Sequence, residues 1–156
     1  MSRTDRPTLP KDALVTRNSP LHGKGVFATR RIPAGTPLLE YKGERISMKE
    51  ALRRYPEDPD PYHTFLFELD DGSVIDATHT RCQTRWINHS CDPNCEAVER
   101  GGRIWIEALR DIRAGEELAY DYGFVLEERH SPAVKKRYPC WCRTAKCRGT
   151  MLARKR

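Results

Sequence analysis

Residues 85–95, RWINHSCDPNC, form the stretch of sequence that decides the fold. It gathers two Asn, a His and two Cys around a proline. Asn and Pro favour turns, whereas His and Cys bind metals and take part in catalysis. The stretch could therefore be a turn, a metal site or part of a reaction centre, and the rest of the sequence has to decide among these.

The bulk composition allows one compact domain. The chain has 156 residues, of which 38% are hydrophobic and 32% are charged, so it is more polar than an average globular domain but far from a disordered chain. No run approaches the roughly 18 apolar residues of a membrane helix, and the N-terminus lacks the apolar middle of a secretory signal. We expect an intracellular protein that does not span a membrane. Its six cysteines should then be reduced thiols or metal ligands.

The charge is divided unevenly along the chain. Residues 129–156 contain ten Lys and Arg and no acidic residue, so residues 1–128 hold 18 basic and 22 acidic residues, a net of −4. An acidic body suits a cationic substrate, and a basic end suits a polyanion such as nucleic acid. A solvated basic tail is the plainer interpretation of that end.

Short apolar runs between turn signals predict a mostly β domain with little helix. The expected elements are a loose lead-in over residues 1 to about 18, strands at 25–30 and 36–41, a short helix after Ser47 that ends before Pro56, a loop at 56–61, and hairpins at 64–77 and 96–109. Ser47 and Glu50 have the spacing of a capping box.

Two segments echo one another. RDIRAGEELAYDYG at 110–123 repeats the pattern of RRIPAGTPLLEYKG at 30–43, with Ile, any residue, Ala, Gly and a run ending in Tyr. We interpret this as one turn-to-strand solution used twice. Neither a dinucleotide-binding GxGxxG nor a phosphate loop occurs.

Three cysteines at the C-terminal end predict a zinc site. Cys140, Cys142 and Cys147 lie within eight residues in CWCRTAKCRG. A closed structural zinc site needs four ligands, so a fourth must come from elsewhere, and Cys91 or Cys95 is the obvious donor. Zinc would pin the basic end against the body.

These motifs together resemble a known family. GKGVFA at 23–28, YKGE at 41–44, RWINHSCDPNC, GEELAYDYG at 115–123 and CWCRTAKCRG, in this order, are similar to the SET domain and post-SET zinc segment of protein-lysine methyltransferases. The match covers about residues 14–152. The cysteine-rich segment that often precedes the domain is missing, so a minimal, bacterial-type version is expected.

The resemblance implies a fold and an activity. The fold would be mostly β (β-rich α+β), with several small sheets, a pseudoknot-like C-terminal region and a C-terminal zinc segment. Residues 1–13 would be a lead-in, 14–128 the SET domain and 129–156 the basic post-SET segment. The activity would be methyl transfer from S-adenosylmethionine to a lysine of a basic protein, histone-like or ribosomal. The lysine, whose pKa in water is about 10.4, must lose its proton, which desolvation and a neighbouring positive sulfonium both favour.

The resemblance also implies roles for single residues. Tyr122 matches the active-site tyrosine, whose hydroxyl lies by the methyl group and the amine. Tyr120 matches a switch position at which Tyr limits the product to one or two methyl groups. Phe65 stands where many relatives carry a tyrosine, so the channel is roomier, and the number of methyl groups stays open.

The remaining implied residues bind cofactor and metal. Asn88 and His89 match the pair that binds the amino acid end and the adenine of the cofactor. The other expected cofactor contacts are Gly23, Lys24, Gly25, Val26, Arg85 and Trp141. The implied zinc ligands are Cys91, Cys140, Cys142 and Cys147, whereas Cys82 and Cys95 are expected to be buried thiols.

Two alternatives belong to other functional classes. A zinc-stabilised module could bind nucleic acid or protein through its basic end without catalysis, although that end has little aromatic interleaving. Cys91 could instead be a thiol nucleophile with His89 as its base, which zinc ligation would exclude. The cellular site is expected to be cytoplasmic in a bacterium and nuclear or chromatin-associated otherwise.

Overall fold

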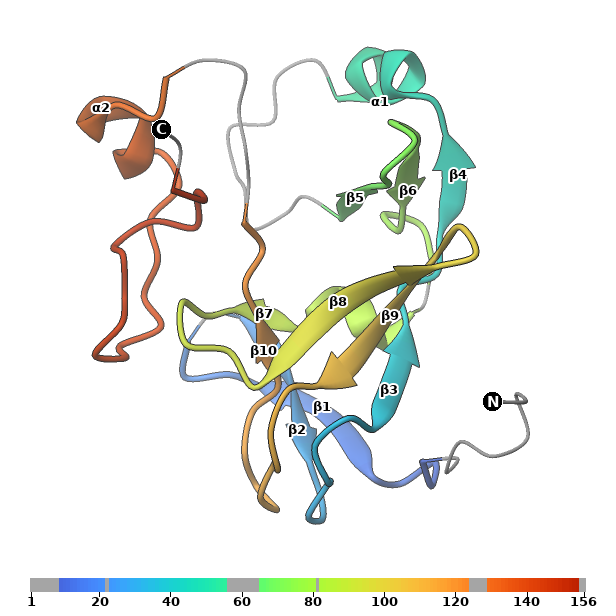
Figure 1. Ribbon diagram of the computed structural model, residues 1–156, viewed down its shortest axis with the longest axis vertical. Helices are drawn as coiled ribbons and strands as arrows, with labels where there is room; N and C mark the ends of the chain where they lie inside the picture. The colour runs from blue at the N-terminus through green and yellow to red at the C-terminus, as the bar shows by residue number, and fades with distance from the viewer. Residues whose placement is uncertain (1–8, 22, 56–64, 81, 124–128, 155–156) are drawn as a thin grey trace.

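The computed structural model shows a domain built from several small sheets (Figure 1). It describes residues 9–21, 23–55, 65–80, 82–123 and 129–154. The loop expected at 56–61 lies outside these residues. Within them, no helix is long and apolar enough to cross a membrane.

Short strands outnumber helices along the chain, as the sequence predicts. The strands are β1 (Leu14–Asn18), β2 (Lys24–Ala28), β3 (Pro37–Glu40), β4 (Glu44–Ile46), β5 (Leu66–Glu68), β6 (Val74–Asp76), β7 (Asn88–His89), β8 (Cys95–Arg100), β9 (Arg103–Ala108) and β10 (Ala119–Tyr120). The helices are α1 (Met48–Arg54), the 3₁₀ helix η3 (Gln83–Trp86) and α2 (Pro132–Lys136).

Both predicted hairpins are present. β8 and β9 pair antiparallel around a two-glycine turn, and β3 adds to the other edge of β9. β5 and β6 form the second hairpin, and β4 pairs with β6 to complete a separate sheet beneath α1 (Figure 1). Alternating apolar residues of β9 enter the main core, where Ile106 is fully buried.

Helix α1 starts and stops where the sequence predicts. The Ser47 hydroxyl accepts a hydrogen bond from the Glu50 backbone N–H at 3.0 Å, which satisfies one of the unpaired donors of the first turn. The helix ends at Arg54, two residues before Pro56, because a proline disfavours helical backbone in the residue before it. The Glu50 carboxylate pairs with Arg53 and Arg54.

One segment was predicted wrongly. Residues 14–18, assigned to the loose lead-in, form strand β1, which pairs antiparallel with β2 over its full length. The strand carries polar side chains at three of its five positions, so its sequence lacks the alternation that marks a half-buried strand. Its antiparallel pairing with the next strand, β2, supplies the structure.

The two echoing segments adopt the same turn and lie side by side. Ile32 and Ile112 face each other across an antiparallel bridge, with two backbone N–H···O bonds of 2.8 Å, and both side chains are fully buried. Gly35 and Gly115 take nearly the same left-handed backbone, with φ of 82° and 86°. Such a backbone favours glycine, which explains why both segments contain the Ala-Gly pair.

The last strand returns beside a strand far earlier in the chain. β10 pairs parallel with β7, although the β8–β9 hairpin between them belongs to another sheet. This crossing is the pseudoknot-like arrangement implied by the family resemblance. The segment after residue 129, drawn in orange and red, then runs beside the loop that follows β7 (Figure 1). The crossing therefore brings the NHSC, YDY and cysteine motifs to one place.

Candidate active site and metal centre

The pairing of β7 with β10 forms the centre of the site. It sets Asn88 opposite Ala119 and His89 opposite Tyr120. Asn94, only 3% exposed, holds the backbone at the start of β10. Its Nδ2 donates to the Glu117 carbonyl and its Oδ1 accepts from the Ala119 N–H, both at 2.9 Å.

Tyr122 is held at both its backbone and its hydroxyl. The hydroxyl donates to the Ile87 carbonyl, and the backbone N–H donates to His89 Nδ1 at 3.0 Å. The half-buried ring packs against both the main core and the group of cysteines. Its centroid lies 4.8 Å from that of the Tyr120 ring. The two tyrosines predicted for the reaction centre are thus in contact.

His89 is buried and is oriented as a donor to sulfur. Because Nδ1 accepts the Tyr122 N–H, the neutral ring carries its proton on Nε2, which lies 3.4 Å from Cys91 Sγ. Burial lowers the pKa of His89, although the nearby Asp121 carboxylate opposes this, so the ring is neutral at neutral pH. A ring that donates its proton toward the sulfur cannot act as its base. This geometry argues against the alternative of Cys91 as a nucleophile activated by His89.

Aromatic side chains enclose the region beside Tyr120. Tyr120 is 7% exposed, and burial raises its pKa. Tyr41 is also buried, and its pKa is raised by burial and by the neighbouring Tyr120. Tyr41 packs on Phe67 at 5.5 Å between ring centroids, and Phe65 joins the same apolar cluster. Both phenols therefore stay neutral and can hydrogen bond without introducing a charge.

Trp86, which was not among the predicted site residues, connects three of them. Its ring centroid lies 4.6 Å from Arg85 Cζ and 5.3 Å from Lys24 Nζ, and the Phe65 ring meets its edge at 5.7 Å. Arg85 donates to the Thr78 carbonyl, while its buried Nε has no partner among the described residues. Two cations on one aromatic ring, one of them incompletely satisfied, suit the anionic end of a ligand.

The glycine loop joins the same centre. Asn88 Nδ2 donates to the Lys24 carbonyl at 3.0 Å, so the loop and the NHSC motif are directly linked. Gly23 has a left-handed φ of 47°, and Gly25 and Val26 are buried as part of β2. The backbone of the loop therefore comes close to Asn88.

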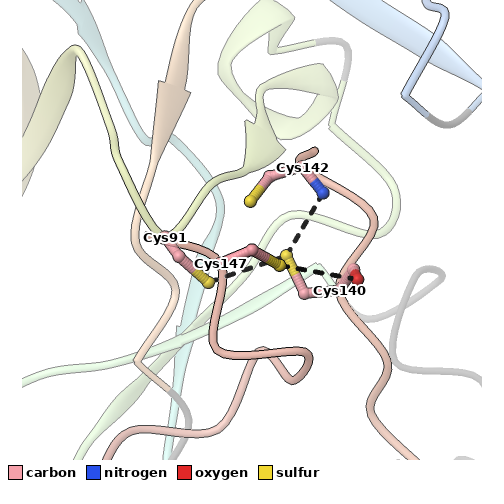
Figure 2. Close-up of side chains that lie close together, drawn as sticks. All are labelled: Cys91, Cys140, Cys142 and Cys147. Carbon is pink, nitrogen blue, oxygen red and sulfur yellow. Dashed lines mark hydrogen bonds between the residues drawn. The ribbon is translucent and has the colours of Figure 1, made fainter. Parts of the chain in front are cut away.

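Four cysteines converge beside this centre (Figure 2). The Sγ atoms of Cys91, Cys140, Cys142 and Cys147 all lie within 4.8 Å of one another. Cys91 and Cys140 are 3.7 Å apart, close to the separation of about 3.8 Å that tetrahedral Zn–S bonds of about 2.3 Å require. Cys91 is thus the fourth member, as the family resemblance implied, although the cysteine spacing alone left Cys91 and Cys95 both open. The cluster could hold a metal ion of the zinc type.

Each of the four sulfurs also has a polar donor. Backbone N–H groups of Arg148, Cys142 and Gly149 lie 3.3 to 3.4 Å from the sulfurs of Cys91, Cys140 and Cys147, respectively, and the Thr144 hydroxyl lies 3.3 Å from Cys142 Sγ. Four thiolates around a divalent cation leave a net charge of −2, and such donors offset it. This pattern fits thiolate ligands better than four unrelated thiols.

An ion pair ties the cysteine segment to the tyrosine motif. The Arg148 guanidinium binds both carboxylate oxygens of Asp121, at 2.8 and 2.9 Å. Asp121 lies between Tyr120 and Tyr122, whereas Arg148 directly follows Cys147. The pair therefore links the position of the metal-type cluster to that of the two tyrosines.

Three further residues were predicted either to contact the cofactor or to be buried thiols. Trp141, expected over the cofactor, is 54% exposed. Cys95 is fully buried, as expected, and burial raises its pKa to about 12. Cys82 is half-buried rather than buried, and its thiol donates to the Glu40 carbonyl at 3.2 Å.

Several residues that build the site were not predicted from the sequence. Trp86, Asn94 and Glu117 lie inside the motifs of the site, and Asp121 separates the two predicted tyrosines. Their place within those motifs was the available signal. Their partners are distant in sequence, and so their roles became visible only in the structure.

Comparison with known proteins agrees with this geometry. Residues 23–123 match the SET domain family. The chain is 44% identical to "Histone-lysine N-methyltransferase, H3 lysine-4 specific" of Chaetomium globosum over 138 residues, which are 84% of the chain and 12% of that relative. It is 40% identical to the protein of the same name in Saccharomyces cerevisiae over 89% of the chain and 13% of the relative.

A human relative gives the same result. "Histone-lysine N-methyltransferase 2B" of Homo sapiens is 39% identical over 88% of the chain and 5% of the relative. The chain thus spans 5 to 13% of the length of these three curated relatives. The family match covers the loop, the NHSC motif and the tyrosine motif, and the cysteine cluster that follows is arranged like a post-SET zinc site. This chain belongs to the SET domain family.

Proposed function

We propose that the chain is a protein-lysine N-methyltransferase that uses S-adenosylmethionine. The observation that carries the proposal is the pairing of β7 with β10, which brings the expected cofactor pair, Asn88 and His89, against the expected reaction centre at Tyr120 and Tyr122. The relatives that match over most of the chain are named histone-lysine methyltransferases. A lysine of a basic, histone-like protein is the proposed substrate, which would place the chain at chromatin or another nucleoprotein.

The cofactor would lie between the glycine loop, the NHSC motif and Trp141. S-adenosylmethionine, when bound, supplies a methyl group on a positively charged sulfur. Lys24 and Arg85 offer cations for its carboxylate, and the buried Arg85 Nε, which has no hydrogen-bond partner in the described part of the chain, supports this assignment. Asn88 offers a side-chain amide for the same amino acid end, close to the Lys24 backbone.

The chain's own residues would position the substrate lysine and remove its charge. Tyr120, Tyr122 and Phe65 would line an apolar channel in which an ammonium group loses hydration, so its pKa falls toward neutrality. The Tyr122 hydroxyl donates to the Ile87 carbonyl, so its oxygen is fixed and can accept a hydrogen bond from the amine. Positioning of this kind contributes a large share of catalysis when the reaction itself is a direct displacement.

Zinc is the metal we propose for the cysteine cluster. Its ligands would be Cys91, Cys140, Cys142 and Cys147, and its role would be structural, because four protein ligands leave no open position. The metal would hold the basic segment against the NHSC loop and so complete the wall of the site behind Tyr122. The basic end would then face the substrate or nucleic acid as part of the fold.

Methyl transfer tests the proposal directly. Labelled S-adenosylmethionine is incubated with core histones and cell lysate, using the wild-type chain and the variant Tyr122→Phe. We expect transfer to fall about 100-fold or more in the variant, the typical effect of losing one positioned hydrogen-bonding group at a reaction centre. Circular dichroism should show an unchanged fold.

A second tyrosine provides a matched control. The Tyr55 hydroxyl bonds to Asp76 and Thr78 under α1. Tyr55→Phe should leave transfer within about twofold, although it removes a hydroxyl of the same kind. An unchanged rate in Tyr122→Phe would remove Tyr122 from the mechanism. If the wild-type chain neither transfers methyl groups nor binds the cofactor, but binds DNA with steep salt dependence, the binding-module alternative would replace the proposal.

A further inference from the structure

The carboxylate of Glu117 lies at the junction of three segments. Its Oε1 accepts from the Ser19 hydroxyl at 2.8 Å, and its Oε2 accepts from Asn88 Nδ2 at 2.8 Å. Its backbone is fixed independently, because its carbonyl accepts from Asn94 and its residue forms a β-bridge with Phe27. The side chain therefore joins Ser19, which directly follows β1, to the glycine loop and the NHSC motif from a rigid base.

These contacts decide which way the Asn88 amide faces. Its Nδ2 lies 2.8 Å from Glu117 Oε2 and 3.0 Å from the Lys24 carbonyl. Both partners can only accept hydrogen bonds, so the NH₂ group must face them. The amide oxygen of Asn88, an acceptor, consequently points away from these two partners.

Gly25 gives independent support for a fixed carboxylate. A Cβ atom added at this position would lie 2.3 Å from Glu117 Oε2 and 2.9 Å from its Cδ, far inside contact distance. Gly23, by contrast, has nothing within 4 Å of such an atom, and its glycine is explained by its positive φ. Glycine at position 25 thus serves to admit the Glu117 carboxylate against the loop.

We propose that Glu117 is a positioning residue of the cofactor site, which turns the Asn88 amide so that its oxygen accepts from the α-ammonium group of the cofactor. This inference rests on the proposed function. Glu117 touches neither cofactor nor substrate in this role. It acts through Asn88 and through the Lys24–Gly25 backbone, and it selects for a ligand with a cationic amino group at that point.

A comparison of two ligands that differ only in the α-ammonium group distinguishes this positioning role from a general structural role. Calorimetry would measure binding of S-adenosylhomocysteine and of its deamino analogue, which lacks only the α-ammonium group. The wild-type chain should prefer S-adenosylhomocysteine. Glu117→Ala should lower the affinity for S-adenosylhomocysteine about tenfold or more, which is the free-energy contribution of one hydrogen bond to a charged group. Its affinity for the deamino analogue should stay within about threefold of wild type, the effect of a weak hydrogen bond at most.

Two further variants sharpen the test. Glu117→Gln keeps one acceptor for Asn88 and should bind both ligands within about threefold of wild type, since a neutral hydrogen bond replaces a charged one. Glu50→Ala is the matched control, because this carboxylate pairs with Arg53 and Arg54 of α1 instead. It should leave both affinities unchanged.

Gly25→Ala completes a mutant cycle. Its new methyl group should displace the Glu117 carboxylate and reproduce the loss of selectivity, while adding Gly25→Ala to Glu117→Ala should cause no further loss. Equal weakening of both ligands in Glu117→Ala, or equal losses in the Ala and Gln variants, would overturn the inference alone. No binding of S-adenosylhomocysteine by the wild-type chain would instead overturn the proposed function.

Discussion

The ion pair between Arg148 and Asp121 should couple the cysteine segment to the reaction centre. Arg148→Met removes the charge and keeps most of the side-chain length, and Asp121→Asn removes the partner charge and keeps the shape. These variants and their double mutant form a thermodynamic cycle that isolates the interaction of the two side chains. The Arg148 backbone N–H, which points to Cys91 Sγ, is unchanged in all three.

The structure bounds the size of this coupling. The side chains are 17% and 37% exposed, and two N–H···O bonds join them. Exposed ion pairs contribute below about 1 kcal/mol, whereas hydrogen bonds to charged groups contribute about 1.5–3 kcal/mol. A half-exposed, bidentate pair falls between them, so we expect a coupling free energy of about 1–2 kcal/mol.

Three measurements check this prediction. Denaturant unfolding of the four proteins gives the coupling free energy, elemental analysis gives the zinc content, and methyl transfer gives the rate. We expect one zinc per chain throughout, because no ligand is altered, together with a transfer rate lowered by at most about 5- to 30-fold, the kinetic equivalent of that coupling. A coupling below about 0.3 kcal/mol, or loss of zinc from Arg148→Met, would refute the idea that the side chains link two otherwise independent parts.

The remaining predictions concern the product, the metal and the thiols. Tyr120→Phe should raise the methylation state that accumulates on a peptide, because it removes a buried hydroxyl from the channel; intact-mass analysis reads this directly, and an unchanged product distribution would argue against the switch role. Cys142→Ser should abolish stoichiometric zinc in elemental analysis and lower the melting temperature, whereas Cys82→Ser should retain the metal. In the metal-loaded protein, Cys95 should resist alkylation until unfolding, since burial raises its pKa to about 12. Rapid alkylation of Cys91 in the same sample would speak against zinc ligation.

The elements that the sequence predicted correctly are those with local signals. Turn glycines between apolar runs marked both hairpins, and Ser47 with Pro56 marked the limits of α1. The duplicated Ala-Gly turn was recognisable in the sequence because one left-handed backbone position favours glycine in both copies. Strand β1 was missed because its polar side chains give no period, and only its pairing with β2 makes it a strand.

The sequence by itself determined the residue types of the site and their family. The order of the glycine, NHSC, tyrosine and cysteine motifs identified the SET domain, and three clustered cysteines indicated a metal of the zinc type. Cysteine spacing left Cys91 and Cys95 both open as the fourth ligand and the family resemblance favoured Cys91, but only the fold shows Cys91 Sγ 3.7 Å from Cys140 Sγ. The tertiary structure also revealed Glu117 and Asp121 as connecting residues. Their partners lie 27 to 98 positions away, and such pairings arise from chain crossings that no local pattern encodes.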